Sequence, residues 1–458
     1  MNPLLRPLGP LILLAGALAC GHRRAPGQAS AGAVDAFVAP YVSSNNFTGV
    51  ILVARGDSVL LERGYGLANP ELGVANTPRS RFHIASVTKA FTAAAILWLE
   101  ERGRLRTSQP VAGYLPGYPN GEKLRLEHLL THTSGIPNLD GPDWDREERL
   151  PHSTAELVGL FKDRPLEFEP GARTSYSNSN YSLLALIIEQ VSGQAYGDFM
   201  RDSIFVPLGL SATLHDGDMT RLIPDRATGT EPDGVKGLRF PRYVDWSART
   251  GSGSVVTTAG DLRRFMRALF SGELIGRQSV ERILAPAEGF AYGWARDQRL
   301  GRKVIRAGGR SPGFNASVEH YLDDGTDVVV LTNSYSPVGQ DPVFLDGLHS
   351  VIFGRAATPR SIAPVQPAAG SLAKLEGRYR MPHDYFVPDA TLTLSERGDH
   401  LEARWTDGAV NTVYPIGLNR FLDRNYWAEL TFRRDASGKV TGLDYALGPG
   451  FFAARIGR

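Results

Sequence analysis

The sequence predicts an α+β protein: an antiparallel sheet built from chain-distant strands, a helical insert between them, and a small all-β domain at the C-terminus. Three observations support this fold class. Strand-like runs occur at 48–66 and return at 290–333, segments between 108 and 245 are helical and broken by proline and glycine, and short alternating runs follow residue 371. Because strands and helices do not alternate in a repeating series, we do not expect a parallel sheet.

Composition excludes several classes of protein. The 458 residues include 50 Lys and Arg against 48 Asp and Glu, which leaves a formal net charge of +2. This balance predicts no nucleic-acid partner and no polybasic membrane patch. The single cysteine, Cys20, excludes an intrachain disulfide and a thiolate metal site.

The first residues have the pattern of an export signal. Residues 1–19 contain an apolar run too short for a membrane span, and it ends in Ala17-Leu18-Ala19, with alanines at the positions typical of a cleavage site. Cys20 follows directly, so the segment resembles a bacterial lipoprotein signal in which this cysteine carries the lipid; simple secretion is the alternative. Residues 20–34 indicate a flexible tether. We expect a lipid-anchored protein of the bacterial cell envelope that faces the periplasm.

The main domain is expected over 35–354. It begins with a hairpin, whose strands at 48–54 and 58–66 flank Arg55-Gly56-Asp57. The other elements follow from apolar periodicity and from glycine and proline stops. We expect helices at 86–102, 181–191, 261–271 and 341–353, and strands at 290–297, 303–307, 315–322 and 326–333.

A proline-rich stretch separates the C-terminal domain. Residues 355–371 contain three prolines and many alanines, which indicates a linker. The alternating runs over 372–458 predict a small β domain. Its core is expected to contain Tyr379, Trp405, Tyr414, Phe421 and Trp427.

Ser86-Val87-Thr88-Lys89 is the strongest chemical pattern in the chain. A serine at a helix start and a lysine three residues later share one helix face. A lysine shielded from water has a lowered pKa, so its neutral amine can take the proton that makes a serine hydroxyl nucleophilic. A helix-capping serine beside an exposed lysine is the alternative. Ser371-Leu372-Ala373-Lys374 has the same spelling but no apolar helix after it, and we assign it no role.

A second motif lies before the helix expected at 181–191. Tyr176 and Asn178 are two residues apart on a loop, so both side chains can enter one cleft. The tyrosine could relay a proton to the leaving group, and the amide could hold a substrate carbonyl and orient the lysine. A loop tyrosine packed over the core is the alternative.

The third motif is Ala307-Gly308-Gly309-Arg310, at the expected end of a strand. Paired glycines allow the backbone to approach a ligand closely, and its N–H groups could complete an oxyanion hole with the N–H of Ser86. An ordinary glycine-rich turn is the alternative. His128 and His132 have the spacing of metal ligands on a helix, but the sequence offers no third ligand nearby, so we expect structural packing.

In this order the three motifs resemble those of the serine β-lactamases and penicillin-binding-protein-like hydrolases. The closest branch is the class C-like one, which includes D-alanyl-D-alanine carboxypeptidases and esterases. The resemblance covers about 35–355 and extends to 126–137 (LEHLLTHTSGIP), 251–265 (GSGSVVTTAGDLRRF) and Tyr292-Gly293-Trp294. It implies a β-lactamase/transpeptidase-like fold and no metal or organic cofactor.

The resemblance also implies roles for single residues. Ser86 corresponds to the nucleophile, Lys89 to its base and Tyr176 to the proton relay. Asn178 corresponds to the substrate-binding amide, and the N–H groups of Ser86 and Arg310 correspond to the oxyanion hole. Gly308 and Gly309 would border the substrate.

One position departs from the branch. Where its members usually carry Lys, His or Trp at the head of the third motif, this chain has Ala307. Its neighbour Arg306 should face away from the cleft because strand side chains alternate, whereas Arg310 could lean into it. We expect a serine hydrolase that forms an acyl-enzyme with an ester, lactam or peptidoglycan-like substrate. The alternative is a non-catalytic envelope protein that binds peptidoglycan fragments or a protein partner.

Overall fold

The computed structural model describes residues 31–139, 141–285, 289–360, 363–385, 387–406, 408–447 and 450–457. The expected signal segment and Cys20 lie outside these residues. The first element is α1 (Ala31–Ser43), which the sequence analysis did not predict. The expected tether over 20–34 is therefore too long at its end, because Val34 is buried with Phe37 in the packed face of this helix.

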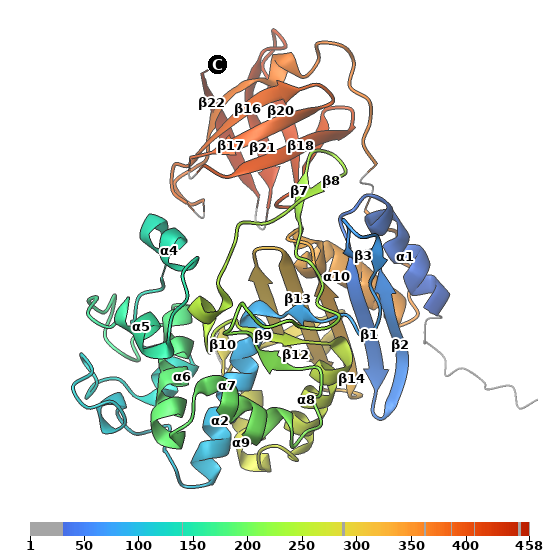
Figure 1. Cartoon of the computed structure of the whole chain (residues 1–458). Helices are drawn as coiled ribbons and strands as arrows, with labels where there is room; N and C mark the ends of the chain where they lie inside the picture. The colour runs from blue at the N-terminus through green and yellow to red at the C-terminus, as the bar shows by residue number, and fades with distance from the viewer. Residues whose placement is uncertain are drawn as a thin grey trace, which may run out of the picture.

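Seven antiparallel strands form the main sheet, in the order β10-β11-β12-β13-β14-β1-β2 (Figure 1). The N-terminal hairpin supplies β1 (Gly49–Arg55) and β2 (Ser58–Tyr65). The later strands are β10 (Phe290–Ala291), β11 (Trp294–Arg299), β12 (Arg302–Ser311), β13 (Phe314–Tyr321) and β14 (Thr326–Thr332). The pairing of β1 with β14 confirms the predicted sheet of chain-distant strands.

The sheet separates two apolar cores. Along β1, Val50 and Leu52 face the larger core, which contains the helices of the insert, whereas Ile51 and Val53 face the smaller core beneath α1 and α10 (Pro342–Ile352). This alternation follows from the two-residue period of a strand. It explains why β1 is apolar on both faces.

Helices of the insert lie beside the sheet, on the left in Figure 1. α2 (Thr88–Glu101) is almost wholly buried. The others are α3 (Leu126–Leu130), α4 (Gly141–Glu147), α5 (Thr154–Gly159), α6 (Asn178–Ser192), α7 (Tyr196–Met200), α8 (Ala259–Ser271) and α9 (Arg277–Leu284). No helix within the described residues is long and apolar enough to span a membrane.

Short strands complete the main domain. β5 (Phe82–His83), β9 (Val255–Thr257) and β6 (Leu214–His215) form a small three-stranded sheet. Two further hairpins pair β3 (Leu67–Asn69) with β4 (Val74–Ala75) and β7 (Glu231–Asp233) with β8 (Gly237–Arg239).

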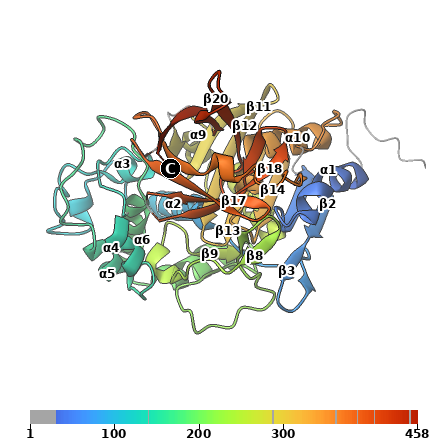
Figure 2. The same ribbon diagram turned by 90° about the horizontal axis from the view of Figure 1, so that it is seen from above.

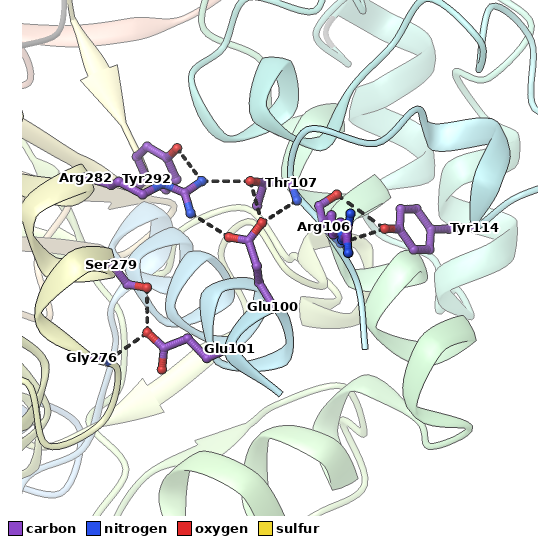
Figure 3. Close-up of polar contacts among 9 residues, drawn as sticks. All are labelled: Glu100, Glu101, Arg106, Thr107, Tyr114, Gly276, Ser279, Arg282 and Tyr292. Atoms are coloured by element: carbon purple, nitrogen blue, oxygen red, sulfur yellow. Dashed lines mark hydrogen bonds and ion pairs between the residues drawn. The ribbon is translucent and has the colours of Figure 1, made fainter. Parts of the chain in front are cut away.

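A polar network joins the end of α2 to α9 and to the turn between β10 and β11 (Figure 3). Glu100 accepts hydrogen bonds from the backbone N–H of Thr107 (2.6 Å) and from its hydroxyl (2.8 Å). Arg282 forms an ion pair with Glu100 and donates to the Tyr292 hydroxyl (3.1 Å). Since Tyr292 precedes Gly293, this network holds the β10–β11 turn against α2.

The C-terminal domain is a closed barrel of eight strands above the main domain (Figures 1 and 2). They are β15 (Gly377–Arg380), β16 (Thr391–Arg397), β17 (His400–Trp405), β18 (Val410–Gly417), β19 (Arg420–Asp423), β20 (Ala428–Arg434), β21 (Val440–Ala446) and β22 (Phe451–Gly457). Tyr379, Trp405 and Phe421 belong to its core, as expected. Tyr414 and Trp427 do not: they pack into the smaller core of the main domain.

Arg424 anchors the barrel on the main domain. Its side chain is fully buried, and Nε donates to Oδ1 of Asn46 (2.9 Å). Its other nitrogens donate to backbone carbonyls, including those of Gly234 (2.7 Å) and Gly237 (2.8 Å) in the β7–β8 hairpin. A buried guanidinium is stable only with its donors satisfied, so this one side chain fixes three segments relative to one another.

Candidate active site

Ser86 lies in a short 3₁₀ turn, Ala85–Val87, between β5 and α2. The preceding residue, Ala85, has a φ of 46°, in the left-handed region that a residue with a Cβ rarely adopts. Such strain persists only where surrounding structure imposes it, and it is concentrated at functional sites. The helix expected from residue 86 therefore begins two residues later, and the serine is presented on a tight turn.

Lys89 points back from the first turn of α2 toward Ser86. Its Nζ lies 3.1 Å from Oγ of Ser86, 2.8 Å from Oδ1 of Asn178 and 2.8 Å from the carbonyl oxygen of Ser252. The last two oxygens only accept hydrogen bonds. In the neutral amine they take both N–H groups, so the remaining lone pair faces the serine hydroxyl.

The surroundings of Lys89 favour this neutral form. The side chain is 2% exposed. Burial, with the positive charge of Arg249 as the second cause, lowers the pKa of Lys89 well below its ordinary value of 10.5.

Tyr176 completes a triangle with these two residues. Its hydroxyl lies 2.8 Å from Oγ of Ser86 and donates to Oδ1 of Asn178 over 3.3 Å. Although the residue as a whole is partly exposed, desolvation by the surrounding protein raises the pKa of Tyr176 to about 12. The phenol therefore keeps its proton at neutral pH.

His132 lies beneath Tyr176, with ring centroids 4.6 Å apart. Its Nδ1 accepts from the backbone N–H of Ser177 (3.2 Å), and burial together with the charge of Lys89 lowers the pKa of His132 to about 3. His132 has a φ of 57° and follows α3, so the predicted single helix through His128 and His132 is wrong. No cluster of three or more potential metal ligands exists among the described residues.

Asn178 begins α6 and faces Lys89. It is held by Asn138, whose Oδ1 accepts from the backbone N–H (2.9 Å) and from Nδ2 (3.2 Å) of Asn178. The residues lining the cavity around Ser86 do not include Asn178. Its position in the structure is that of an orienting partner for the lysine.

The third motif lies directly against the serine turn. β12 continues through both glycines to Ser311, so the predicted strand end before them is wrong. A Cβ at Gly309 would lie 2.0 Å from the carbonyl oxygen of Ile84 and 2.9 Å from the backbone nitrogen of Ser86. Only glycine allows this approach. Gln340 holds the strand there by donating to the carbonyl oxygens of Gly309 (2.7 Å) and Ala316 (2.9 Å).

Side chains alternate along this part of β12. Ala307 is buried and shares its face with Gly309, toward the larger core. Arg306 and Arg310 alternate with them. Arg306 forms an ion pair with Asp297 (2.9 Å), and the Arg310 guanidinium lies over the Tyr335 ring, 4.2 Å from its centroid.

A cavity of about 580 Å³ opens on these groups, a size typical of small-molecule sites. Its lining includes Ser86, Lys89 and Tyr176, together with Ala307, Gly308, Gly309 and Arg310. Gly293 also lines it, and a Cβ there would lie 2.5 Å from the backbone nitrogen of Ala90, so the turn after Tyr292 packs tightly on α2.

Sequence reasoning missed four groups that the fold brings to the site. They are His132, Asn138, the carbonyl of Ser252 and Gln340. The stretches 126–137 and 251–265 had pointed to the neighbourhood of two of them, although no local pattern indicates which atom faces Lys89. A serine–lysine–tyrosine cluster around a buried lysine, where an antiparallel sheet meets a helical insert, defines a serine hydrolase of the β-lactamase and penicillin-binding-protein type.

Comparison with known proteins agrees with this class. The chain belongs to the beta-lactamase family, whose model matches residues 34–344. A penicillin-binding protein of Bacillus subtilis (strain 168) is 30% identical over 419 residues, which cover 85% of this chain and 90% of that protein. A putative penicillin-binding protein of the same organism is 33% identical over 297 residues, 64% of this chain and 72% of the relative.

Solved structures show the same fold. A penicillin-binding protein from Bacillus halodurans superposes with a TM-score of 0.58 at 26% identity, over 66% of this chain and 94% of that one. A structure described as an octameric penicillin-binding protein homologue from Pyrococcus abyssi covers 92% of this chain and 99% of its own, with a TM-score of 0.62 at 23% identity. The fold match to the second therefore includes the C-terminal region.

Proposed function

We propose that the protein hydrolyses an ester or amide through an acyl-enzyme on Ser86. The observation that supports this most directly is that Oγ of Ser86 lies within hydrogen-bonding distance of both Nζ of the buried Lys89 (3.1 Å) and the Tyr176 hydroxyl (2.8 Å). Intact-protein mass after exposure to a fluorophosphonate tests whether Ser86 is reactive. Exposure to a penicillin in parallel tests whether a β-lactam acylates it. If neither adduct forms, the result favours the alternative, a non-catalytic protein that binds peptidoglycan fragments or a protein partner.

The proton steps follow from the geometry. The neutral amine of Lys89 takes the hydroxyl proton of Ser86 as Oγ attacks the carbonyl carbon. The tetrahedral intermediate collapses when the bond to the leaving group breaks, and Tyr176 gives that group its proton and regains one from Lys89. Water then attacks the acyl-enzyme, loses its proton to the same base, and releases the acid together with the free serine.

The negative charge that forms on the carbonyl oxygen requires donors. We assign this role to the backbone N–H groups of Ser86 and Arg310, which belong to the two segments that meet at Gly309. Preorganised backbone donors of this kind contribute strongly to acyl transfer.

Ala307 bears on the substrate class, and the structure supplies the geometry for a prediction. Its side chain faces the serine side of β12 and offers no cation to a substrate carboxylate beside the scissile bond. We expect Ala307→Lys to raise cephalosporin turnover about tenfold to hundredfold relative to that of an uncharged short ester, because charge-assisted hydrogen bonds contribute ~1.5–3 kcal/mol. Steady-state kinetics on both substrates measure the ratio. Efficient cephalosporin hydrolysis by the wild type would contradict this account of the third motif.

Export and anchoring form a separate proposal. Cell-envelope location is supported by the signal pattern of the sequence and by relatives named as penicillin-binding proteins. We expect Cys20→Ala to move the protein from the membrane pellet to the soluble exported fraction with unchanged activity, since several acyl chains anchor a protein stably. Fractionation and mass analysis of the mature N-terminus measure this. If the mature wild-type N-terminus carries no lipid, the lipid-anchor proposal fails and only secretion remains.

A further inference from the structure

A second cavity lies between the barrel and the main domain. Its volume is about 460 Å³, within the range of small-molecule sites. The barrel contributes Tyr385, Trp405 and Tyr426 to its lining, and the main domain contributes Arg310 and residues 340–342. Arg310, Gln340 and Pro342 also line the cavity around Ser86, so the two cavities are neighbours.

Arg310 provides a positive charge that no ion pair among the described residues neutralises, although this charge acts on the carboxylate of Glu231. No carboxylate lies within 4 Å of its guanidinium in the described part of the chain, and its buried Nε has no hydrogen-bond partner there. Arginines nearby differ: Arg306 pairs with Asp297 (2.9 Å) and Arg299 with Glu319 (3.0 Å). A guanidinium between aromatic rings is well suited to a carboxylate, which it can bind through two parallel hydrogen bonds.

Trp405 provides part of the aromatic wall of the cavity. Its side chain is 7% exposed, and Nε1 lacks a hydrogen-bond partner among the described residues. Its ring is parallel to that of Tyr385, with centroids 5.7 Å apart and an interplanar angle of 3°. Nε1 itself is buried, so Trp405 contributes its ring, and not an exposed donor, to the cavity wall.

One acidic residue also lines this cavity. The carboxylate of Asp341 caps α10, where its Oδ2 accepts from the backbone N–H of Phe344 (2.8 Å). It is therefore already engaged by the helix N-terminus.

We propose that this cavity is a second substrate subsite, which binds an aromatic carboxylate at the end of the acyl group distant from the scissile bond. The carboxylate pairs with Arg310, and the ring packs on the aromatic wall that includes Tyr385 and Trp405. The assignment of the ligand as substrate rests on the proposed function. The proposed subsite also gives the barrel, which Arg424 fixes on the main domain, a role in substrate specificity.

A binding experiment tests the subsite without catalysis. The Ser86→Ala protein is titrated calorimetrically with 4-ethylbenzoate and, as the uncharged match, with 4-ethylbenzamide. We expect the carboxylate to bind at least about tenfold more tightly. Arg310→Gln should remove this preference, and Trp405→Phe should weaken both ligands. Arg306→Gln, which removes an already paired arginine four residues away on the same strand, should leave the preference intact.

A kinetic experiment tests the link to the active site. Nitrophenyl esters of ω-(4-carboxyphenyl)alkanoic acids, with increasing spacer length, are compared with their carbamoyl analogues. We expect kcat/KM to favour the carboxylate about tenfold at one spacer length in the wild type and in Arg306→Gln, but not in Arg310→Gln.

The outcomes separate the two proposals. Equal binding of carboxylate and amide, or equal losses in Arg306→Gln and Arg310→Gln, overturns the subsite. Selective binding with no spacer preference overturns its role toward substrate. Selective binding with no hydrolysis of any ester, by contrast, supports the site and overturns the proposed function.

Discussion

Replacing Lys89 by arginine is expected to lower kcat/KM for short nitrophenyl esters by roughly 10² to 10⁴. Arginine has a comparable flexible stem but does not lose its proton, so it cannot serve as the base. Ser86→Ala should cost at least as much, and the double variant should be little worse than either, because nucleophile and base act as a unit. Steady-state assays of nitrophenol release, on protein free of host esterases, measure these rates.

The chain contains its own control for this experiment. Ser371→Ala and Lys374→Arg alter the second S-x-x-K tetrad, which lies beside the barrel at the start of the C-terminal domain, and both should retain wild-type rates. Circular dichroism excludes misfolding as the cause of loss. Wild-type activity in Ser86→Ala would refute the mechanism, and activity in Lys89→Arg would show that the lysine acts through charge alone.

The same base predicts a pH dependence. Lys89 works in its neutral form, so kcat/KM should fall as pH drops through its folded-state pKa, which burial and Arg249 lower well below 10.5. Arg249→Gln removes the charge that contributes to this lowering. The pKa should therefore rise, and the acid limb of the profile should move to higher pH. If the acid limb of the profile does not move, a group other than Lys89 titrates in that pH range.

Gly309→Ala is expected to lower kcat by about 10² to 10³, comparable to the loss of an oxyanion donor. The added Cβ would lie 2.0 Å from the carbonyl oxygen of Ile84, which is backbone and cannot rotate away. β12 must then move from the serine turn, and the N–H of Arg310 moves with it. The effect should appear in kcat more than in KM, because the oxyanion forms only during reaction.

Gly308→Ala is the matched control. Its Cβ would point to the other face of β12, where the nearest atom is Nε2 of Gln340 at 3.3 Å, the end of a flexible side chain. We expect less than a tenth of the loss seen with Gly309→Ala. Equal losses in both variants, or a Gly309→Ala enzyme with normal kcat, would contradict the proposed oxyanion hole.

The features that could be predicted from the sequence are local ones. The tetrad Ser86 to Lys89 spans one helical turn, so its shared face follows from the helix period. Apolar runs predicted the sheet strands and the longer helices because burial imposes a two- or 3.6-residue period on residues adjacent in the chain. The small β domain was predicted for the same reason, although neither its closure nor the role of Arg424 has a local signal.

Only the tertiary structure decided which distant groups meet. Ser252 lies 163 residues from Lys89, and nothing in its own stretch indicates that its carbonyl faces the amine. His132, Asn138 and Gln340 reach the site in the same way. Strand alternation predicted that Arg306 faces away from the cleft, yet Arg306 lines the cavity around Ser86, as Arg310 does. The aromatic cavity that also receives Arg310 exists only because the barrel docks there. Such contacts arise from packing between chain-distant segments, and no periodicity along one segment encodes its partner.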